Sequence, residues 1–251
     1  MSLLRVESLD KSFNALRVLR EITLSVDAEE RHVIIGPNGA GKTTLFNCVM
    51  GTIPLSSGKV LLDGKDVGGM PAHRRVPMGM SRTFQKNNLF GRLTIEENLN
   101  LAVEARKPYR FGLFKPLAWR RDLAEESEEM LRQWDMWERR DRRVDELSYG
   151  EQRLLEVMLA IASRPRVLLL DEPTSGMSPA ETSQTIRLIQ DLPRSLTLLV
   201  IEHDMEVVFA IADRITVLHH GEVFLSGTPD EVRGDERVSE IYFGGGAKPH
   251  A

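Results

Sequence analysis

The fold is decided by one stretch of the chain, Gly36-Pro37-Asn38-Gly39-Ala40-Gly41-Lys42-Thr43-Thr44. It fits the pattern G-x-x-x-x-G-K-[ST], in which the backbone N–H groups of a glycine-rich loop surround a phosphate. The preceding Val33-Ile34-Ile35 is typical of a short buried strand, and apolar residues recur at helical spacing from Leu45 to Met50. Glycines let the backbone approach a phosphate without a Cβ in the way, and a helix N-terminus presents N–H groups to an anion. The stretch therefore predicts a phosphate loop between a strand and a helix.

The last residues of this pattern carry its chemistry. The ammonium group of Lys42 is expected to reach the β- and γ-phosphates of a nucleotide, and the hydroxyl of Thr43 to bind Mg²⁺. A glycine-rich turn that binds nothing is the alternative. It is the weaker one, because every position of the pattern is filled and the strand–loop–helix context is present. We therefore predict a nucleotide site.

The bulk composition limits the class of protein. With 251 residues, 41% hydrophobic and 28% charged, the chain fits one large domain or two smaller lobes. A formal net charge of −4 argues against nucleic acid as a partner. The longest apolar runs, 167–170 and 196–201, are much shorter than the roughly 20 residues that a membrane helix needs. The N-terminus lacks the apolar region of a signal peptide, and the single Cys48 excludes a disulfide within the chain, so we expect a cytoplasmic protein.

The N-terminal part reads as short strands. Apolar and polar residues alternate at 4–6 and 22–26, and another strand at 59–62 is followed by Asp63-Gly64, a hairpin-type turn. Phe13 is expected in the loop between the first two strands. Its ring could stack on a purine base or fill the space under the loop, and this stretch alone does not separate the two.

The middle of the chain changes character. From about residue 93 to residue 161, helical spacing replaces strand alternation. Thr94 and Glu97 are spaced as a capping box that opens one helix, and a second helix is expected at 118–134. An irregular insert at 107–117 separates them. The arginines that follow, between residues 139 and 143, are interpreted as a solvated linker.

Strand–helix alternation returns after the helical region. The continuous apolar runs 167–170 and 197–201 are typical of parallel strands buried on both faces. The adjacent His219 and His220 are expected to point to opposite faces of a strand, so they suit a shared metal poorly. The predicted division of the chain is a nucleotide-binding α/β core with an antiparallel β part over 1–85 and 162–243, a helical subdomain over 86–161, and a disordered tail over 244–251.

Two acids follow the strand at 167–170. Asp171 and Glu172 stand at its carboxyl end, where open α/β sheets bind their ligands. In P-loop proteins the first such carboxylate holds Mg²⁺, usually through water. A second carboxylate directly after it can polarise a water for attack on the γ-phosphate. A pair of solvated loop acids is the alternative, and it is weak beside a phosphate loop.

A second motif, Leu147-Ser148-Tyr149-Gly150-Glu151-Gln152, precedes an apolar helix. Ser148 and Glu151 have capping-box spacing, which structurally requires no further function. The pattern Leu-Ser-x-Gly-x-Gln is also the signature of the ATP-binding-cassette (ABC) ATPases. The chain resembles an ABC ATPase subunit over nearly its whole length, with phosphate loop, Gln85, signature, Asp171-Glu172 and His203 in the family's order.

The resemblance implies a fold and a set of roles. The fold would be α/β, a P-loop NTPase (RecA-like) core with an N-terminal antiparallel β part and an inserted α-helical subdomain. The cofactors would be ATP and Mg²⁺, with Phe13 stacked on adenine. Gln85 would contact Mg²⁺ and the attacking water, Glu172 would act as the base, and His203 would contact the γ-phosphate. Ser148, Gly150 and Glu151 would face a γ-phosphate held by the other subunit of a dimer.

Several segments look more specifically like the branched-chain amino acid importer ATPases, among them Arg82-Thr83-Phe84-Gln85 and Gly176-Met177-Ser178. Tyr149 and Ser178 depart from the commoner family residues, glycine and aspartate. The resemblance implies membrane permease subunits, a second ATP-binding subunit and, indirectly, a solute-binding protein as partners, at the inner face of the cell membrane.

Other functions remain as alternatives. Closely similar ATPases serve urea, amide or aromatic-acid importers. A soluble ABC protein of DNA repair or translation would resemble a tandem cassette or carry a long coiled-coil insertion, and the chain has neither. A GTPase is disfavoured, because no Asn-Lys-x-Asp motif is present and the signature helix would have no role.

Overall fold

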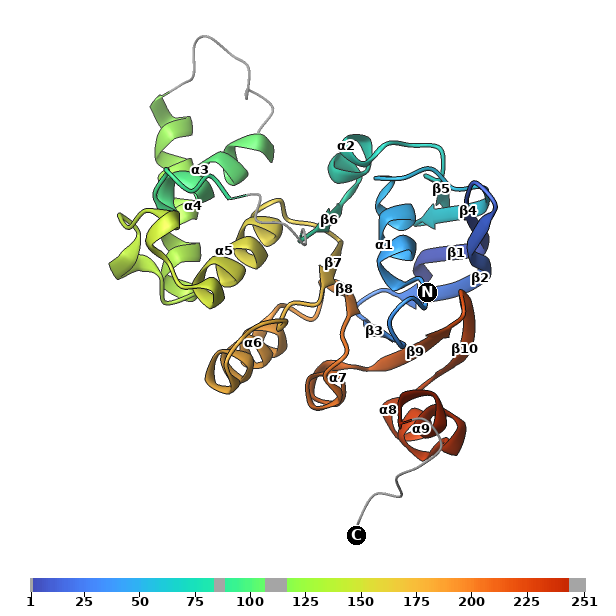
Figure 1. Cartoon of the computed structure of the whole chain (residues 1–251). Coiled ribbons are helices and arrows are strands. Elements are labelled where there is room, and N and C mark those ends of the chain that lie inside the picture. Colours follow the sequence, from blue (N-terminus) through green and yellow to red (C-terminus); the bar gives the residue numbers. More distant parts are fainter. Residues whose placement is uncertain (1, 84–88, 107–116, 244–251) are drawn as a thin grey trace.

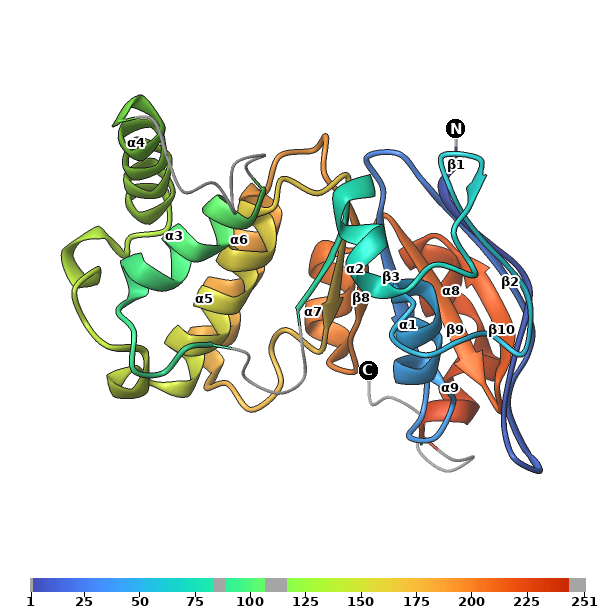
Figure 2. The ribbon, with the colours of Figure 1, turned by 90° about the horizontal axis from the view of Figure 1, so that it is seen from above.

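The computed structural model describes residues 2–83, 89–106 and 117–243 (Figure 1). Gln85, almost all of the insert expected at 107–117 and the tail expected at 244–251 lie outside this part. The described chain forms two sheets with helix α1 between them, and a group of helices beyond the larger sheet (Figures 1 and 2).

The smaller sheet is antiparallel, in the order β2-β1-β4-β5. Its strands are β1 (Ser2–Phe13), β2 (Leu16–Asp27), β4 (Ser57–Leu62) and β5 (Lys65–Asp66). The first two are much longer than the short strands expected from the sequence. Their pairing contains several register shifts, for example between Val6 and Leu9, and each shift interrupts the alternation that marks a strand in the sequence. Phe13 is the last residue of β1.

The larger sheet has the order β10-β9-β3-β8-β7-β6. Five of its strands are parallel, and they are β3 (Arg31–Ile35), β6 (Met80–Arg82), β7 (Val167–Asp171), β8 (Thr197–Ile201) and β9 (Arg214–His219). β10 (Glu222–Gly227) pairs antiparallel with β9. Every residue of β3, β7 and β8 is buried, so the strands expected at 33–35, 167–170 and 197–201 are confirmed.

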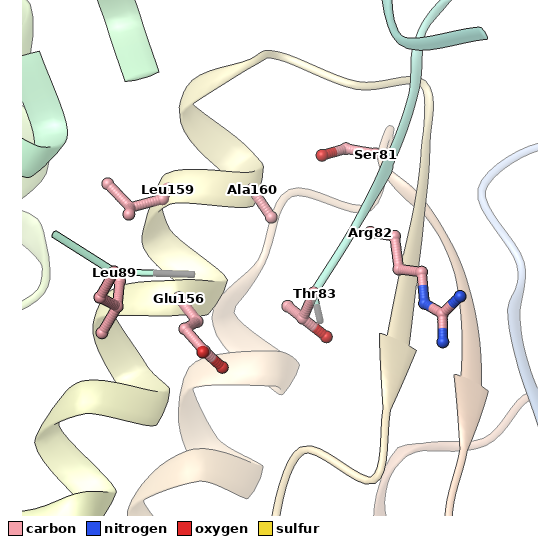
Figure 3. A pocket seen from close by; sticks show the side chains of 7 residues that line it. All are labelled: Ser81, Arg82, Thr83, Leu89, Glu156, Leu159 and Ala160. Carbon is pink, nitrogen blue, oxygen red and sulfur yellow. The ribbon is translucent and has the colours of Figure 1, made fainter. Parts of the chain in front are cut away.

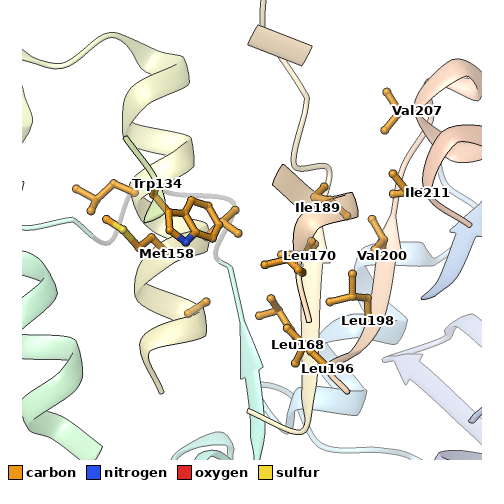
Figure 4. Close-up of a cluster of buried hydrophobic side chains, with 14 of the residues drawn as sticks. Trp134, Met158, Leu168, Leu170, Ile189, Leu196, Leu198, Val200, Val207 and Ile211 are labelled. Atoms are coloured by element: carbon orange, nitrogen blue, oxygen red, sulfur yellow. The ribbon is translucent and has the colours of Figure 1, made fainter. Parts of the chain in front are cut away.

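The two faces of this sheet contribute to different cores. Along β7, Val167 and Leu169 pack with α1 (Lys42–Met50) and the smaller sheet, whereas Leu168 and Leu170 belong to the core on the opposite face. Figure 4 shows Leu170 near Ile189 of α6 (Pro179–Asp191), and Val200 of the neighbouring β8 near Ile211 of α7 (Met205–Ile211). Successive side chains of a strand point to opposite faces, so the apolar run 167–170 packs against helices on both faces of the sheet.

A group of helices follows β6 and precedes β7. It contains α3 (Ile95–Arg106), α4 (Leu117–Gln133) and α5 (Tyr149–Ala162), and α3 packs against both of the others. Thr94 caps α3 as expected, because its hydroxyl accepts from the N–H of Glu97 while its own N–H donates to the Glu97 carboxylate. The remaining helical segments are α2 (Ala72–Arg75), η1 (Val76–Met78), η2 (Trp137–Arg139), η3 (Val144–Glu146), α8 (Pro229–Gly234) and α9 (Glu236–Phe243).

The interpretation of the arginines near residue 140 as a solvated linker holds for Arg142 and Arg143, which are exposed, but not for Arg139 and Arg140. Arg139 forms an ion pair with Glu151, and the Arg140 guanidinium lies 4.2 Å from the ring centroid of Trp137. The segment thus packs against the start of α5. Sequence pattern alone missed this because the partner of Arg139 is contributed by the next helix.

The expectation that the two adjacent histidines point to opposite faces is wrong. The ring centroids of His219 and His220 are 4.0 Å apart, so the rings do not point to opposite faces. His220 has a φ of 50° and stands in the turn after β9, where strand alternation has ended. Within the described ranges, no helix combines the length and apolar character needed to cross a membrane.

Candidate functional site

The phosphate loop joins β3 to α1, as predicted. Helix α1 begins at Lys42, and its N-cap residue Gly41 has a φ of 99° and carries no side chain to cap the first N–H groups. The starts of α5, α6 and α8 differ, because each has a Ser or Thr cap with a Glu three residues later. The first turn of α1 also contains no acidic residue. These uncapped N–H groups, together with the helix dipole, favour an anion at the loop.

Two glycines of the loop are required by close packing. A Cβ on Gly36 would lie 2.2 Å from the carbonyl oxygen of Leu218, and one on Gly41 would lie 2.7 Å from Leu19 Cδ2. Both residues also have positive φ, which side chains disfavour. The loop therefore passes directly against β2 and β9, and this packing fixes its path.

Lys42 lies over the loop that it follows. Its Nζ donates to the carbonyl oxygens of Gly36, at 2.6 Å, and Pro37, at 3.2 Å. Burial lowers the pKa of Lys42, and the nearby carboxylates of Glu172 and Asp171 act against that shift. The ammonium group is therefore held at the loop near both acids, where it can offset phosphate charge.

Asp171 ends β7 and is fully buried. Its Oδ2 accepts a hydrogen bond of 2.6 Å from Arg82 Nη2, while Oδ1 has no hydrogen-bond partner among the described residues. An orphaned buried carboxylate oxygen is the kind of group that a metal-bound water would satisfy. In the described part of the chain, no cluster of three or more His, Cys, Asp or Glu could hold a metal. One carboxylate with the Thr43 hydroxyl suits Mg²⁺, which usually relies on few protein ligands and on phosphates.

Glu172 directly follows the strand and is half-buried. Its φ is 48°, and its N–H donates to the carbonyl oxygen of Ile201 at 2.9 Å. A left-handed conformation is unfavourable for a residue with a side chain, so the surrounding contacts must impose it. Among them is Arg153 on α5, which donates to the carbonyl oxygens of both Asp171 and Glu172.

His203 and an acid that the sequence reasoning missed lie after β8. The imidazole of His203 is 56% exposed, whereas the neighbouring Glu202 side chain is fully buried. Glu202 accepts from the N–H and hydroxyl of Thr174 and from the N–H of His203 at 2.9 Å. It thereby ties the chain after β7 to the chain after β8. The sequence did carry a signal for Glu202: this acid directly follows the apolar run of a buried strand, just as Asp171 ends one.

The signature begins α5, on the other side of β7 from α1 (Figure 1). The predicted capping box is confirmed: the Glu151 N–H donates to Ser148 Oγ at 3.2 Å, and the Ser148 N–H donates to the Glu151 carboxylate at 2.8 Å. Gly150 lies against α6, because a Cβ there would be 2.3 Å from Glu181 Oε1. The starts of α5 and α6 are thus in contact.

The two residues that depart from the commoner family residues both lie near the starts of α5 and α6. Tyr149 is 52% exposed, and its ring lies against Gly176, where a Cβ would be 3.3 Å from the ring. Ser178 caps α6, since its hydroxyl accepts from the Glu181 N–H. Phe13, the expected base-stacking residue, is 46% exposed with Lys11 Nζ at 4.8 Å from its ring centroid.

The comparison with known families decides the identity. The family model described as "ABC transporter" matches residues 19–175. The chain belongs to the ABC transporter family of ATP-binding proteins. As a member it is a nucleotide-binding ATPase, and the family assigned from the motifs in the sequence is confirmed.

Two curated ABC relatives and one solved ABC cassette are similar over almost their whole length. The chain is 38% identical to the high-affinity branched-chain amino acid transport ATP-binding protein BraF of Pseudomonas aeruginosa, over 96% of this chain and 98% of BraF. It is 34% identical to the lipopolysaccharide export system ATP-binding protein LptB of Haemophilus influenzae, over 97% and 98%. The ADP conformation of the ABC cassette MJ1267 matches with a TM-score of 0.85, 28% identity and coverage of 97% and 99%. These likenesses confirm the predicted fold class.

Proposed function

We propose that this ABC ATPase energises an importer of branched-chain or other amino acids, bound through permease subunits to the inner face of the cell membrane. The observation that carries the proposal is the 38% identity to BraF over 96% of the chain. Importers of urea, amides or aromatic acids use closely similar ATPases and remain within the same proposal. The 34% identity to LptB favours a second candidate, the ATPase of a lipopolysaccharide exporter.

The phosphates of ATP would be held by Lys42 and by the uncapped N–H groups at the start of α1. Phe13, exposed at the end of β1, would stack on the adenine ring. Mg²⁺ would be bound by Thr43, by Gln85 and, through water, by the free Oδ1 of Asp171, and would neutralise charge on the phosphate oxygens. The loop residues Gly36, Pro37, Asn38, Gly39, Ala40, Gly41 and Thr44 would complete the site.

Hydrolysis would use Glu172 as the general base. Its carboxylate would take the proton of a water as the water oxygen bonds to the γ-phosphorus, and the bond to the bridging oxygen breaks to leave ADP. His203, with its ring exposed, would contact the γ-phosphate and orient that water. The backbone contacts of Glu172 with Ile201 and Arg153 would fix the position of the base.

The signature would complete the site of a second ATP-binding subunit, either a copy or a paralogue. In one chain the start of α5 and the phosphate loop lie on different sides of β7 (Figure 1). Ser148, Gly150 and Glu151 would therefore face the γ-phosphate bound by the partner. The capped helix start still offers the dipole and the Ser148 hydroxyl to that anion.

The variant Glu172→Gln tests the mechanism. A general base contributes about 10²–10⁴-fold, so turnover should fall at least a hundredfold while ATP binding survives. Unhydrolysed ATP should then hold two subunits together, and light scattering should find a dimer with ATP but not with ADP. Adding Ser148→Arg should abolish that dimer. Wild-type turnover of Glu172→Gln, measured with the partner subunit if one is required, would exclude Glu172 as the base.

Transport by the reconstituted complex tests the substrate. The ATPase and its permease would be placed in liposomes with the solute-binding protein, and the uptake of labelled leucine would be compared with that of labelled urea. Leucine uptake that depends on ATP and disappears in Glu172→Gln supports the proposal. ATP-dependent extraction of lipopolysaccharide from the same vesicles would favour the exporter instead.

A further inference from the structure

Arg82, at the end of β6, joins the phosphate-loop helix to the buried acid. Its Nη2 donates to Asp171 Oδ2 at 2.6 Å, and its Nη1 donates to Asn47 Oδ1 at 2.5 Å. Asn47 lies on α1, one turn after Thr43. The two arms of one guanidinium group thus contact both elements that carry the proposed Mg²⁺ ligands.

The environment holds this guanidinium in one place. The side chain of Arg82 is 5% exposed and that of Asp171 is fully buried. The guanidinium carbon lies 5.7 Å from the ring centroid of Phe46, also on α1. Figure 3 shows the same side chain from the cavity between β6 and α5: Ser81, Thr83 and Glu156 line that cavity, and the Arg82 guanidinium points away from Glu156.

Mg²⁺ makes a strict demand on such an arrangement. It requires nearly octahedral geometry with short bonds, so ligands from two different elements must be set at a fixed separation. Because Arg82 occupies Oδ2 of Asp171, the carboxylate cannot turn freely, and Oδ1 stays available. The bond to Asn47 fixes α1 against the same guanidinium.

We infer that Arg82 is a positioning residue of the magnesium site, one that sets the Asp171 carboxylate against the Thr43 end of α1. The inference rests on the proposed role of Asp171. Contacts behind a metal ligand typically contribute 10–100-fold to metal affinity, so Arg82 should be worth about tenfold or more. The charge of Arg82 has the opposite effect on metal affinity. A nearby cation repels a metal ion, so removal of the charge alone would strengthen metal binding.

The variant Arg82→Lys separates the two effects, because it keeps the charge and removes the planar fork. The probe is Mn²⁺ with ADP, and the readout is the Mn²⁺ dissociation constant measured by electron paramagnetic resonance. Arg82→Lys should weaken Mn²⁺ binding about tenfold. Asn47→Ala should also weaken Mn²⁺ binding. Arg166→Lys, which alters an exposed ion pair with Asp63, is the matched control and should bind as wild type does.

ADP affinity in EDTA and the melting temperature show whether each variant is folded and keeps its phosphate loop. Unchanged ADP affinity beside weaker Mn²⁺ binding supports the inference. Wild-type Mn²⁺ affinity in Arg82→Lys overturns it, as does tighter binding in Arg82→Met, which would make Arg82 a competing cation.

Asp171→Asn distinguishes this inference from the proposed function. If Asp171→Asn weakens Mn²⁺ binding while Arg82→Lys does not, only the role of Arg82 fails. If Asp171→Asn binds Mn²⁺ as wild type does, both the metal role of Asp171 and the inference fail. If Arg82 acts through Asp171, adding Arg82→Lys to Asp171→Asn should cause no further loss, whereas a full additional tenfold loss contradicts that route.

Discussion

Arg153 donates a hydrogen bond of 3.3 Å to the main-chain carbonyl oxygen of Glu172, so the signature helix α5 directly supports the backbone of the proposed catalytic base. The same guanidinium group pairs at 2.5 Å with Glu156, one turn further along the helix, and both side chains are buried. The Arg153 side chain that contacts the Glu172 backbone is therefore also the counter-ion of the buried Glu156 carboxylate. This arrangement allows stability and catalysis to be separated by mutation.

Arg153→Met should destabilise the protein by about 3–5 kcal/mol, because it leaves the buried Glu156 without its counter-ion. The double variant Arg153→Met, Glu156→Met replaces both charges and should recover most of that stability. It should still hydrolyse ATP slowly, with a lower kcat and little change in KM, since the Glu172 carbonyl has lost its donor. Chemical denaturation and steady-state kinetics measure the two effects. Wild-type kcat in a stable double variant would show that Arg153 is only structural.

The pH dependence of stability should report Glu156. Burial raises the pKa of Glu156, against the opposing effect of Arg153. The native state then binds this proton at a pH where the unfolded state has released it, so the contribution of Glu156 to stability falls as pH rises above about 4.5, through the raised pKa. Glu156→Gln lacks this proton. Its free energy of unfolding relative to wild type should therefore increase over that interval, in urea titrations at several pH values. A difference that is independent of pH would contradict the raised pKa.

The parts of the site that the sequence predicted are local ones. The phosphate loop, the capping boxes at Thr94 and Ser148, and the strand before Asp171 each depend on residues within a few positions of one another. Their patterns are set by the period of a helix or strand and by the few residue types that a cap or a tight loop accepts. The strand β7 was predicted just as directly from its apolar run, because both faces of the strand are covered and every residue is buried.

The missed features are pairings between distant residues. Arg82 meets Asp171 only because β6 lies beside β7 in the sheet, and Arg139 meets Glu151 only after η2 folds back on α5. No local period signals either contact. The strands β1 and β2 were predicted too short, because the register shifts in their pairing interrupt the alternation of apolar and polar residues along the sequence. Glu202 was missed although its position after β8 carried a usable signal.

Lys42→Ala should weaken ATP binding about ten- to a hundredfold, because a hydrogen bond to a charged group is worth roughly 1.5–3 kcal/mol. The loop loses its cation but keeps its N–H groups, so binding should fall rather than vanish. Calorimetry with ATP measures the affinity. Lys59→Ala, on the exposed part of β4, serves as the control and should bind as wild type does. Equal affinities in the two variants would remove Lys42 from the phosphate site.

Gly39 and Gly64 form a matched pair that separates backbone strain from phosphate binding. Their φ angles are 81° and 75°, and a Cβ on either would meet no atom within 4 Å. Gly39→Ala and Gly64→Ala should therefore each cost about 1–2 kcal/mol of stability, since both place a side chain in the left-handed region. Only Gly39 lies in the phosphate loop, whereas Gly64 lies in the turn between β4 and β5. A methyl group at Gly39 would occupy space that the phosphates need, so this variant alone should lose ATP affinity, by about tenfold or 1.4 kcal/mol. Urea unfolding and calorimetry on both variants measure the two quantities. Equal ATP affinity in the two would mean that the open side of Gly39 faces solvent and not the nucleotide.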